Sequence, residues 1–175
     1  MYETAQTVFK VYGKLDKTAK SIESMVLKVA LSSFSDRTPC DVSCERICEL
    51  IERKNLLINL KVMVGRALKQ MDDEDLEILS HWLKKNKQPF YFSQRSFFRK
   101  KNLALMKFEK QLEKQGLSKQ KFIDDYADKI HMIGVAYDEV VEKEKLKKER
   151  ALRLSVSLSS NPIKANCDGR IKKGG

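Results

Sequence analysis

Basic side chains that could bind a polyanion are concentrated between residues 87 and 116. This segment holds eight Lys or Arg and only two acids, so it carries about half of the chain's net charge of +11. Lys and Arg neutralise the phosphates of nucleic acids, and Arg or Gln can also form paired hydrogen bonds with base edges. The segment therefore predicts the chemistry of recognition.

The same segment has the pattern of a single helix that would position those side chains. Ser93 is expected to be the N-cap, because its hydroxyl can accept from the first-turn amides, and Gly116 is a natural left-handed stop. An apolar stripe recurs at spacings of seven, three and four: Phe98, Leu105, Phe108 and Leu112. The basic residues lie mostly off this stripe: Arg95, Arg99, Lys100, Lys107, Lys110 and Lys114. A helix with an anchored apolar side and a basic outer side fits the major groove of DNA.

Length and composition bound the class of protein. With 175 residues, 42% hydrophobic and 34% charged, and with 7 Gly and 3 Pro, the chain suits one helix-rich domain, with or without a small helical extension. No apolar run approaches the ~20 residues that span a bilayer, and the first residues lack the apolar core of a signal peptide. We therefore expect no membrane contact and a location in the reducing cytoplasm.

Two clusters could carry other chemistry. Cys40, Cys44 and Cys48 recur every four residues, and a metal cluster is conceivable, but tight chelation usually adds a second pair or histidines. Buried, reduced cysteines on a core-facing helix are the better interpretation. The acids Asp72–Asp75 could hold magnesium, but they fit the positive end of a helix better. With no nucleophile–base pair and no Gly-rich phosphate loop, the sequence predicts no cofactor, no metal and no enzyme.

The apolar periodicity predicts an all-α fold, a helical bundle with a long C-terminal helix. Helical patterns cover residues 2–34, with a break near Gly13, then 42–71, 72–86, 93–116 and 118–150. We expect an N-terminal helical scaffold at 1–71, a helix-turn-helix-like segment at 72–116, a C-terminal helix or arm at 117–154 and a disordered tail at 155–175. In the connector before Ser93, Phe90, Tyr91 and Phe92 are expected to fold back onto the core, although stacking on bases is an alternative.

One resemblance rests on the order of these elements. An acidic helix, Asp72–Asn86, precedes a serine-capped helix, and residues 60–116 resemble the C-terminal DNA-binding region of sigma factors and sigma-like phage regulators. Eight positions match the recognition helix of that family: Ser93, Arg95, Phe98, Arg99, Ala104, Leu105, Lys107 and Phe108. The family has a further short helix before the recognition helix, and the residues from His81 to Phe92 leave no room for it.

The resemblance implies roles for individual side chains and for partners. Gln94, Arg95 and Arg99 would meet base edges. The side chains that would contact phosphates are Ser93, Lys100, Lys101, Lys107 and Lys110. The implied partner is double-stranded DNA, and the full family architecture would add RNA polymerase. RNA as the ligand and homodimer formation stay open.

A second hypothesis is a protein–protein interaction or assembly module without specific nucleic-acid binding. Here the helices at 42–71 and 118–150 would associate with a partner or with themselves. It predicts a large exposed apolar stripe and DNA binding too weak to survive physiological salt.

Overall fold

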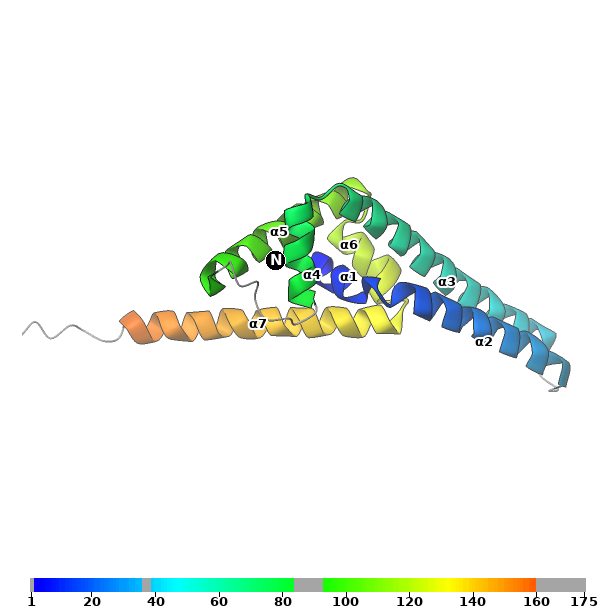
Figure 1. Cartoon of the computed structure of the whole chain (residues 1–175). Helices are drawn as coiled ribbons and strands as arrows, with labels where there is room; N and C mark the ends of the chain where they lie inside the picture. Colours follow the sequence, from blue (N-terminus) through cyan, green and yellow to red (C-terminus); the bar gives the residue numbers. More distant parts are fainter. Residues whose placement is uncertain (1, 36–38, 84–92, 160–175) are drawn as a thin grey trace, which may run out of the picture. The chain divides into compact units, whose positions relative to one another are not determined.

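The computed structural model describes residues 2–35, 39–83 and 93–159. These residues form seven α-helices and one short π-helical segment and no strand, so the predicted all-α class is confirmed. The elements are α1 (Glu3–Tyr12), α2 (Leu15–Ser35), α3 (Cys40–Lys69), α4 (Asp73–Leu83), α5 (Gln94–Lys114), α6 (Lys119–Phe122), η1 (Ile123–Ala127, the π-helical segment) and α7 (His131–Ser159) (Figure 1). The chain divides into two compact units, residues 1–141 and 142–175. None of the described helices is long and apolar enough to cross a membrane.

The first unit is built around α5, which contacts α1, α3 and α4. One side of α5 lies in the core through Phe97, Ala104, Leu105, Phe108 and Leu112. Phe108 is fully buried and meets Phe9 of α1 edge to face, with the ring centroids 5.8 Å apart. This burial holds α5 rigidly on one side and leaves the other side available.

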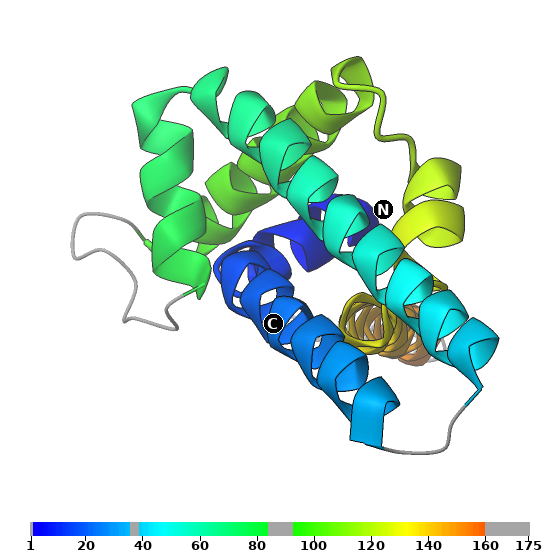
Figure 2. The same ribbon diagram turned by 90° about the vertical axis from the view of Figure 1, so that its right-hand side faces the viewer.

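The helices α2 and α3 form a long antiparallel hairpin in which they lie side by side (Figure 2). The predicted break near Gly13 is confirmed, since α1 ends there and the buried Leu15 begins α2. Two ion pairs join the hairpin: Lys61 Nζ lies 2.6 Å from Asp16 Oδ1, and Lys54 Nζ lies 3.4 Å from Glu23 Oε2. Helix α3 continues through Asn55 and Gly65 without interruption.

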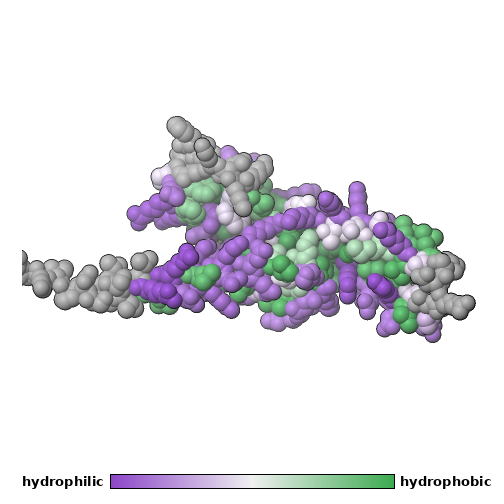
Figure 3. Space-filling model, turned by 90° about the horizontal axis from the view of Figure 1, so that it is seen from below, coloured by the Kyte–Doolittle hydropathy of each residue, from purple (hydrophilic) through white to green (hydrophobic). Residues whose placement is uncertain are grey.

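The expectation that the cysteines are buried is wrong. Cys40, Cys44 and Cys48 are free thiols and all three are exposed, as is Ile51 on the same helix. The core side of α3 is formed further along by Leu57, Leu60 and Val64 (all buried). At the end of the hairpin where α2 finishes and α3 begins, the two helices have mainly each other as neighbours. Hydrophobic side chains are exposed there, among them Leu27, Leu31 and Val42 (Figure 3).

The predicted stop at Gly116 is confirmed in detail. Gly116 has φ +82°, a left-handed conformation that favours glycine. The Leu117 N–H donates to the Leu112 carbonyl at 3.0 Å, and the Gly116 N–H donates to the Glu113 carbonyl at 2.9 Å. This pair of bonds is the Schellman motif, and its usual apolar contact is supplied by Leu112 and Leu117, which are both buried.

The expectation of one helix over residues 118–150 is wrong. Ser118 does cap α6, accepting from the Lys121 N–H at 3.3 Å, but the chain turns between η1 and His131, where α7 begins. Gly134 permits this turn, because a Cβ there would lie 2.7 Å from the Ala127 carbonyl oxygen. The turn lets the core bury side chains on both sides of it, including Phe122 and Ile133.

Helix α7 is longer than expected. It continues to Ser159, past the predicted boundary at residue 154, and residues 160–175 of the predicted tail lie outside the described residues. In the second unit, taken by itself, residues 142–159 are helical, and the side chains of residues 142–153 are mainly hydrophilic (Figure 3). Within it, Lys147 Nζ lies 2.7 Å from Glu144 Oε1, the i,i+3 spacing of an exposed helical pair.

A carboxylate from α5 supports the first turn of α1. The Ala5 N–H donates to Glu109 Oε2 at 2.8 Å, which satisfies one amide at the start of α1. Burial raises the pKa of the Glu109 carboxyl, and the hydrogen bond from Ala5 offsets part of this rise. The ionised form of Glu109 is therefore disfavoured in the folded state.

Replacing Glu109 by Gln is expected to stabilise the protein at neutral pH. The amide oxygen can still accept from Ala5, whereas the buried charge is gone. The pKa of Glu109 is higher in the folded state than in the unfolded state, so the wild-type protein loses stability as the pH rises from below the unfolded-state pKa through the folded-state pKa. The variant has no ionisable group at this position and lacks this loss. Thermal unfolding of both proteins is measured at about pH 7 and at about pH 4. The variant should be the more stable protein at about pH 7, and this difference in stability should disappear at about pH 4. A variant less stable than wild type at pH 7 would contradict this account.

Candidate nucleic-acid interface

The first turn of α5 is organised by its cap. Ser93 is in an extended conformation, and its hydroxyl oxygen accepts from the Ser96 N–H at 3.2 Å, as predicted. Gln94 and Arg95 follow on this turn and Arg99 on the next, and all three are exposed. The three residues predicted to meet base edges are therefore accessible at one end of the helix.

Four basic residues form an exposed line along α5, which we call the α5 ridge: Arg95, Arg99, Lys110 and Lys114. Their positions differ by four, eleven and four residues, which keeps them on one side of a helix. Among the described residues, none of the four has a carboxylate partner. Exposed Leu103 and Asn102 lie between the two basic pairs. The ridge lies opposite the buried side of α5, so its charge faces solvent.

Two other lysines of α5 are directed at α4. Lys107 Nζ donates to Asp75 Oδ2 at 2.6 Å and to Asp72 Oδ2 at 3.0 Å, and Lys100 Nζ pairs with the Glu74 carboxylate. The hydrogen bonds to Asp75 and Asp72 raise the pKa of Lys107. The acidic start of α4 thus neutralises this side of α5. The assignment of Lys100 and Lys107 to phosphate contacts stays a prediction. If it holds, DNA phosphates must compete with these carboxylates for the two ammonium groups.

Lys101 and Phe98 occupy positions that the sequence pattern did not predict. Lys101 is only 8% exposed, and its Nζ lies 5.3 Å from the ring centroids of both Trp82 and Phe98. Phe98, which was predicted to lie on the buried stripe, is 48% exposed, and Phe97 is buried instead. Between the two rings, the Lys101 ammonium forms cation–π contacts that join α4 to α5. In this arrangement Lys101 is not accessible to a phosphate, so its prediction as a phosphate contact is corrected.

The signal for this arrangement was present in the spacing. Phe97, Lys101, Ala104 and Phe108 recur at four, three and four residues, the period of a buried helical side. A lysine in that series was easily assigned to the surface because of its charge. Its long apolar stem lets the side chain lie along the core while the ammonium contacts aromatic rings.

The arrangement of α4 and α5 is compatible with a helix-turn-helix but does not define one. The two helices pack against each other. Residues 84–92 join them and lie outside the described residues. The predictions for this connector, a helix end near Asn86 and a fold-back of Phe90, Tyr91 and Phe92, therefore lie outside the described part of the chain.

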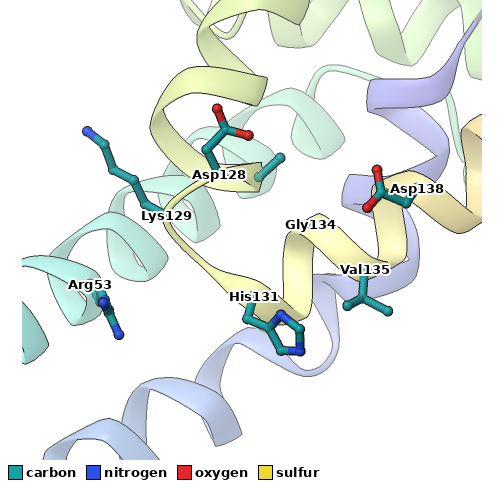
Figure 4. Close-up of a pocket in the computed structure, with 8 residues that line it drawn as sticks. Arg53, Asp128, Lys129, His131, Gly134, Val135 and Asp138 are labelled. Carbon is teal, nitrogen blue, oxygen red and sulfur yellow. The ribbon is translucent and has the colours of Figure 1, made fainter.

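A concave site lies where η1 meets α7, with a cavity volume of about 430 Å³. Its lining includes Arg53 of α3, Asp128, Lys129, His131, Gly134 and Asp138 (Figure 4). The charged side chains point in different directions and do not converge (Figure 4). Arg53 pairs with Glu49 at 3.6 Å, and Lys129 pairs with Asp125 at 3.7 Å. Across residues 2–35, 39–83 and 93–159, no group of three or more His, Cys, Asp or Glu could hold a metal ion.

Comparison with models of known protein families, with characterised proteins and with solved structures found no match to this chain. Function is therefore inferred from the α5 ridge and from the local geometry around it.

Proposed function

We propose that the chain is a non-enzymatic protein that binds double-stranded DNA through α5 and regulates transcription, as its resemblance to sigma-like regulators implies. The α5 ridge carries this proposal. Its four cations extend over five turns of a helix whose other side is fixed in the core, which suits a helix that must enter a groove without deforming. Gln94, Arg95 and Arg99 lie at the N-terminal end, where the recognition helix of a helix-turn-helix meets base edges.

The charges around the ridge favour one orientation on DNA. Asp72, Glu74 and Asp75 line the α4 side of α5 and would repel phosphates, although Lys100 and Lys107 offset their charge. We place the phosphate backbone along Lys110 and Lys114, which line a cavity with the end of α3 and Asp72 but have no carboxylate partner among the described residues. In this orientation Lys110 positions the protein, while Arg95 and Arg99 supply sequence preference.

Selection from a random pool tests the proposal. The purified chain is mixed with random-sequence duplex DNA at about 50 mM and about 200 mM salt, and the retained fraction is sequenced. We expect enrichment of one short motif at the higher salt, because base contacts persist where screening weakens generic attraction. A competing pool of random RNA should not displace the selected DNA.

Two results would contradict the proposal. Retention only at low salt without a motif would mean that the charge attracts polyanions generically. Displacement by RNA at equal concentration would mean that RNA is the ligand.

A further inference from the structure

Helix α3 carries a second, mainly apolar series on its exposed side. We call it the α3 seam: Cys44, Cys48, Ile51, Asn55, Ile58 and Val62. Its members alternate at spacings of four and three residues, the heptad spacing of a coiled coil. All six are exposed, and the three aliphatic side chains are 42% to 45% exposed.

Among the described residues, the hydrophobic core does not include this seam. The packing of α3 within the first unit uses other residues: Leu57, Leu60, Val64 and Ala67 are buried in the core, while Lys54 and Lys61 pair with Glu23 and Asp16 of α2. A helix at the surface of a single domain needs only one apolar stripe. A second stripe with a period of 3.5 residues indicates a second helix as its partner.

The seam has defined ends. One step before Cys44 in the heptad series is Asp41, which is exposed and charged. One step after Val62 is Gly65, where an added Cβ would lie 3.5 Å from the hydroxyl of Tyr12. The seam therefore covers residues 44–62, about 27 Å of helix.

The polar members of the seam identify the partner. In the heptad series Cys48, Asn55 and Val62 take the a positions, and Cys44, Ile51 and Ile58 take the d positions. An asparagine at an a position leaves its amide unsatisfied against an apolar partner, whereas a second asparagine opposite it can both donate and accept. Parallel pairing of two identical helices supplies that asparagine, and it also sets each thiol opposite the same thiol.

The flanking charges select the direction. Glu52 follows Ile51, and Lys54 precedes Asn55. Antiparallel pairing centred on the seam would bring Glu52 beside Glu52 and Lys54 beside Lys54 of the second copy. Parallel pairing instead sets Lys54 near Asn59 and Glu52 near Ile47, so neither of these two charges meets a like charge. Lys61 would lie near Arg66 of the second copy, but its charge is already paired with Asp16. We propose that the α3 seam binds the α3 seam of a second copy of this chain in parallel register.

Solution mass tests the pairing. The full chain, held in reductant, is expected to be a dimer by sedimentation equilibrium. Replacing Ile51 and Ile58 together by Asp is expected to weaken dimerisation by about 100-fold or more, because two apolar layers are lost. Both side chains are exposed in the single copy, so helicity and melting of the monomer should change little. The matched control is Val135→Asp, a 45% exposed position on α7 that should leave the dimer intact.

Thiol cross-linking tests the register. Two other thiols are first replaced by Ser: Cys167, which lies outside the described residues, and Cys40, whose Sγ lies 3.8 Å from that of Cys44 and could form an intrachain disulfide with it. Diamide then accepts the two electrons and two protons that a pair of thiols releases on forming a disulfide. Parallel pairing predicts a disulfide between Cys48 of one copy and Cys48 of the other, or between the two Cys44 residues, identified by mass spectrometry after proteolysis. In antiparallel pairing Cys44 would face Val62 and Cys48 would face Ile58, and no such link would form.

Three outcomes would overturn the proposal. The first is a wild-type chain that stays monomeric at about 100 μM, which is well above the micromolar range of weak complexes. The second is a dimer that survives the Ile51→Asp and Ile58→Asp changes. The third is a dimer that forms no interchain disulfide with diamide. None of them depends on DNA, so failure here is distinguishable from failure of the proposed function.

Discussion

Reversing the charge of Arg95 and Arg99 together is expected to weaken DNA binding by about 100-fold or more, because each arginine supplies a base or phosphate contact and its replacement repels the backbone. Both side chains are exposed and have no carboxylate partner among the described residues. The free energy of unfolding of the Arg95→Glu, Arg99→Glu variant should therefore stay near that of wild type. Titration of labelled duplex at physiological salt, with urea unfolding alongside, measures both quantities.

A matched variant separates specific contact from general charge. Lys17 and Lys20 are exposed on α2, so Lys17→Glu, Lys20→Glu lowers the net charge by the same amount at a distant site. This variant should retain most of the binding. Equal loss of binding in both variants would show generic attraction, and equal loss of stability would show that the arginines serve folding.

Replacing Phe108 by Ala is expected to destabilise the protein by about 3–5 kcal/mol. Phe108 is fully buried where α5 meets α1, and the change removes its ring contact with Phe9 and leaves a cavity. For a domain of this size such a loss is a large part of the total stability. Urea unfolding followed by far-UV circular dichroism measures the difference in free energy.

The same substitution on the exposed side of the helix is the control. Phe98→Ala removes a half-exposed ring and its cation–π contact with Lys101, which should reduce stability by roughly 1 kcal/mol. A cost equal to that of Phe108→Ala would mean that α5 is rotated relative to the structure, with Phe98 in the core.

Features with a local chemical cause could be predicted from the sequence. A serine before a helical pattern and a glycine after it act through backbone groups only a few residues away, and Ser93 and Gly116 behave as expected. The break at Gly13 and the acidic start of α4 have the same local character.

Features that depend on a neighbouring helix were harder to predict. The pairing of Lys100 and Lys107 with α4 needs the packing of α4 on α5, which the pattern of either helix alone does not contain. The turn between η1 and α7 has no proline, and it depends on the close approach of Gly134 to Ala127. The cysteines looked like core residues because cysteine is usually buried, but the described residues leave that side of α3 exposed.

The hydrogen bond from Ala5 to Glu109 also bears on the order of events during synthesis. The two residues are 104 positions apart, so at ordinary translation rates α1 would be made roughly 5 to 20 s before the carboxylate that supports its first turn. The hairpin of α2 and α3 joins neighbouring segments and can close during that interval. The apolar side of α1 would meanwhile be open to chaperones, and the arrival of α5 would complete the domain.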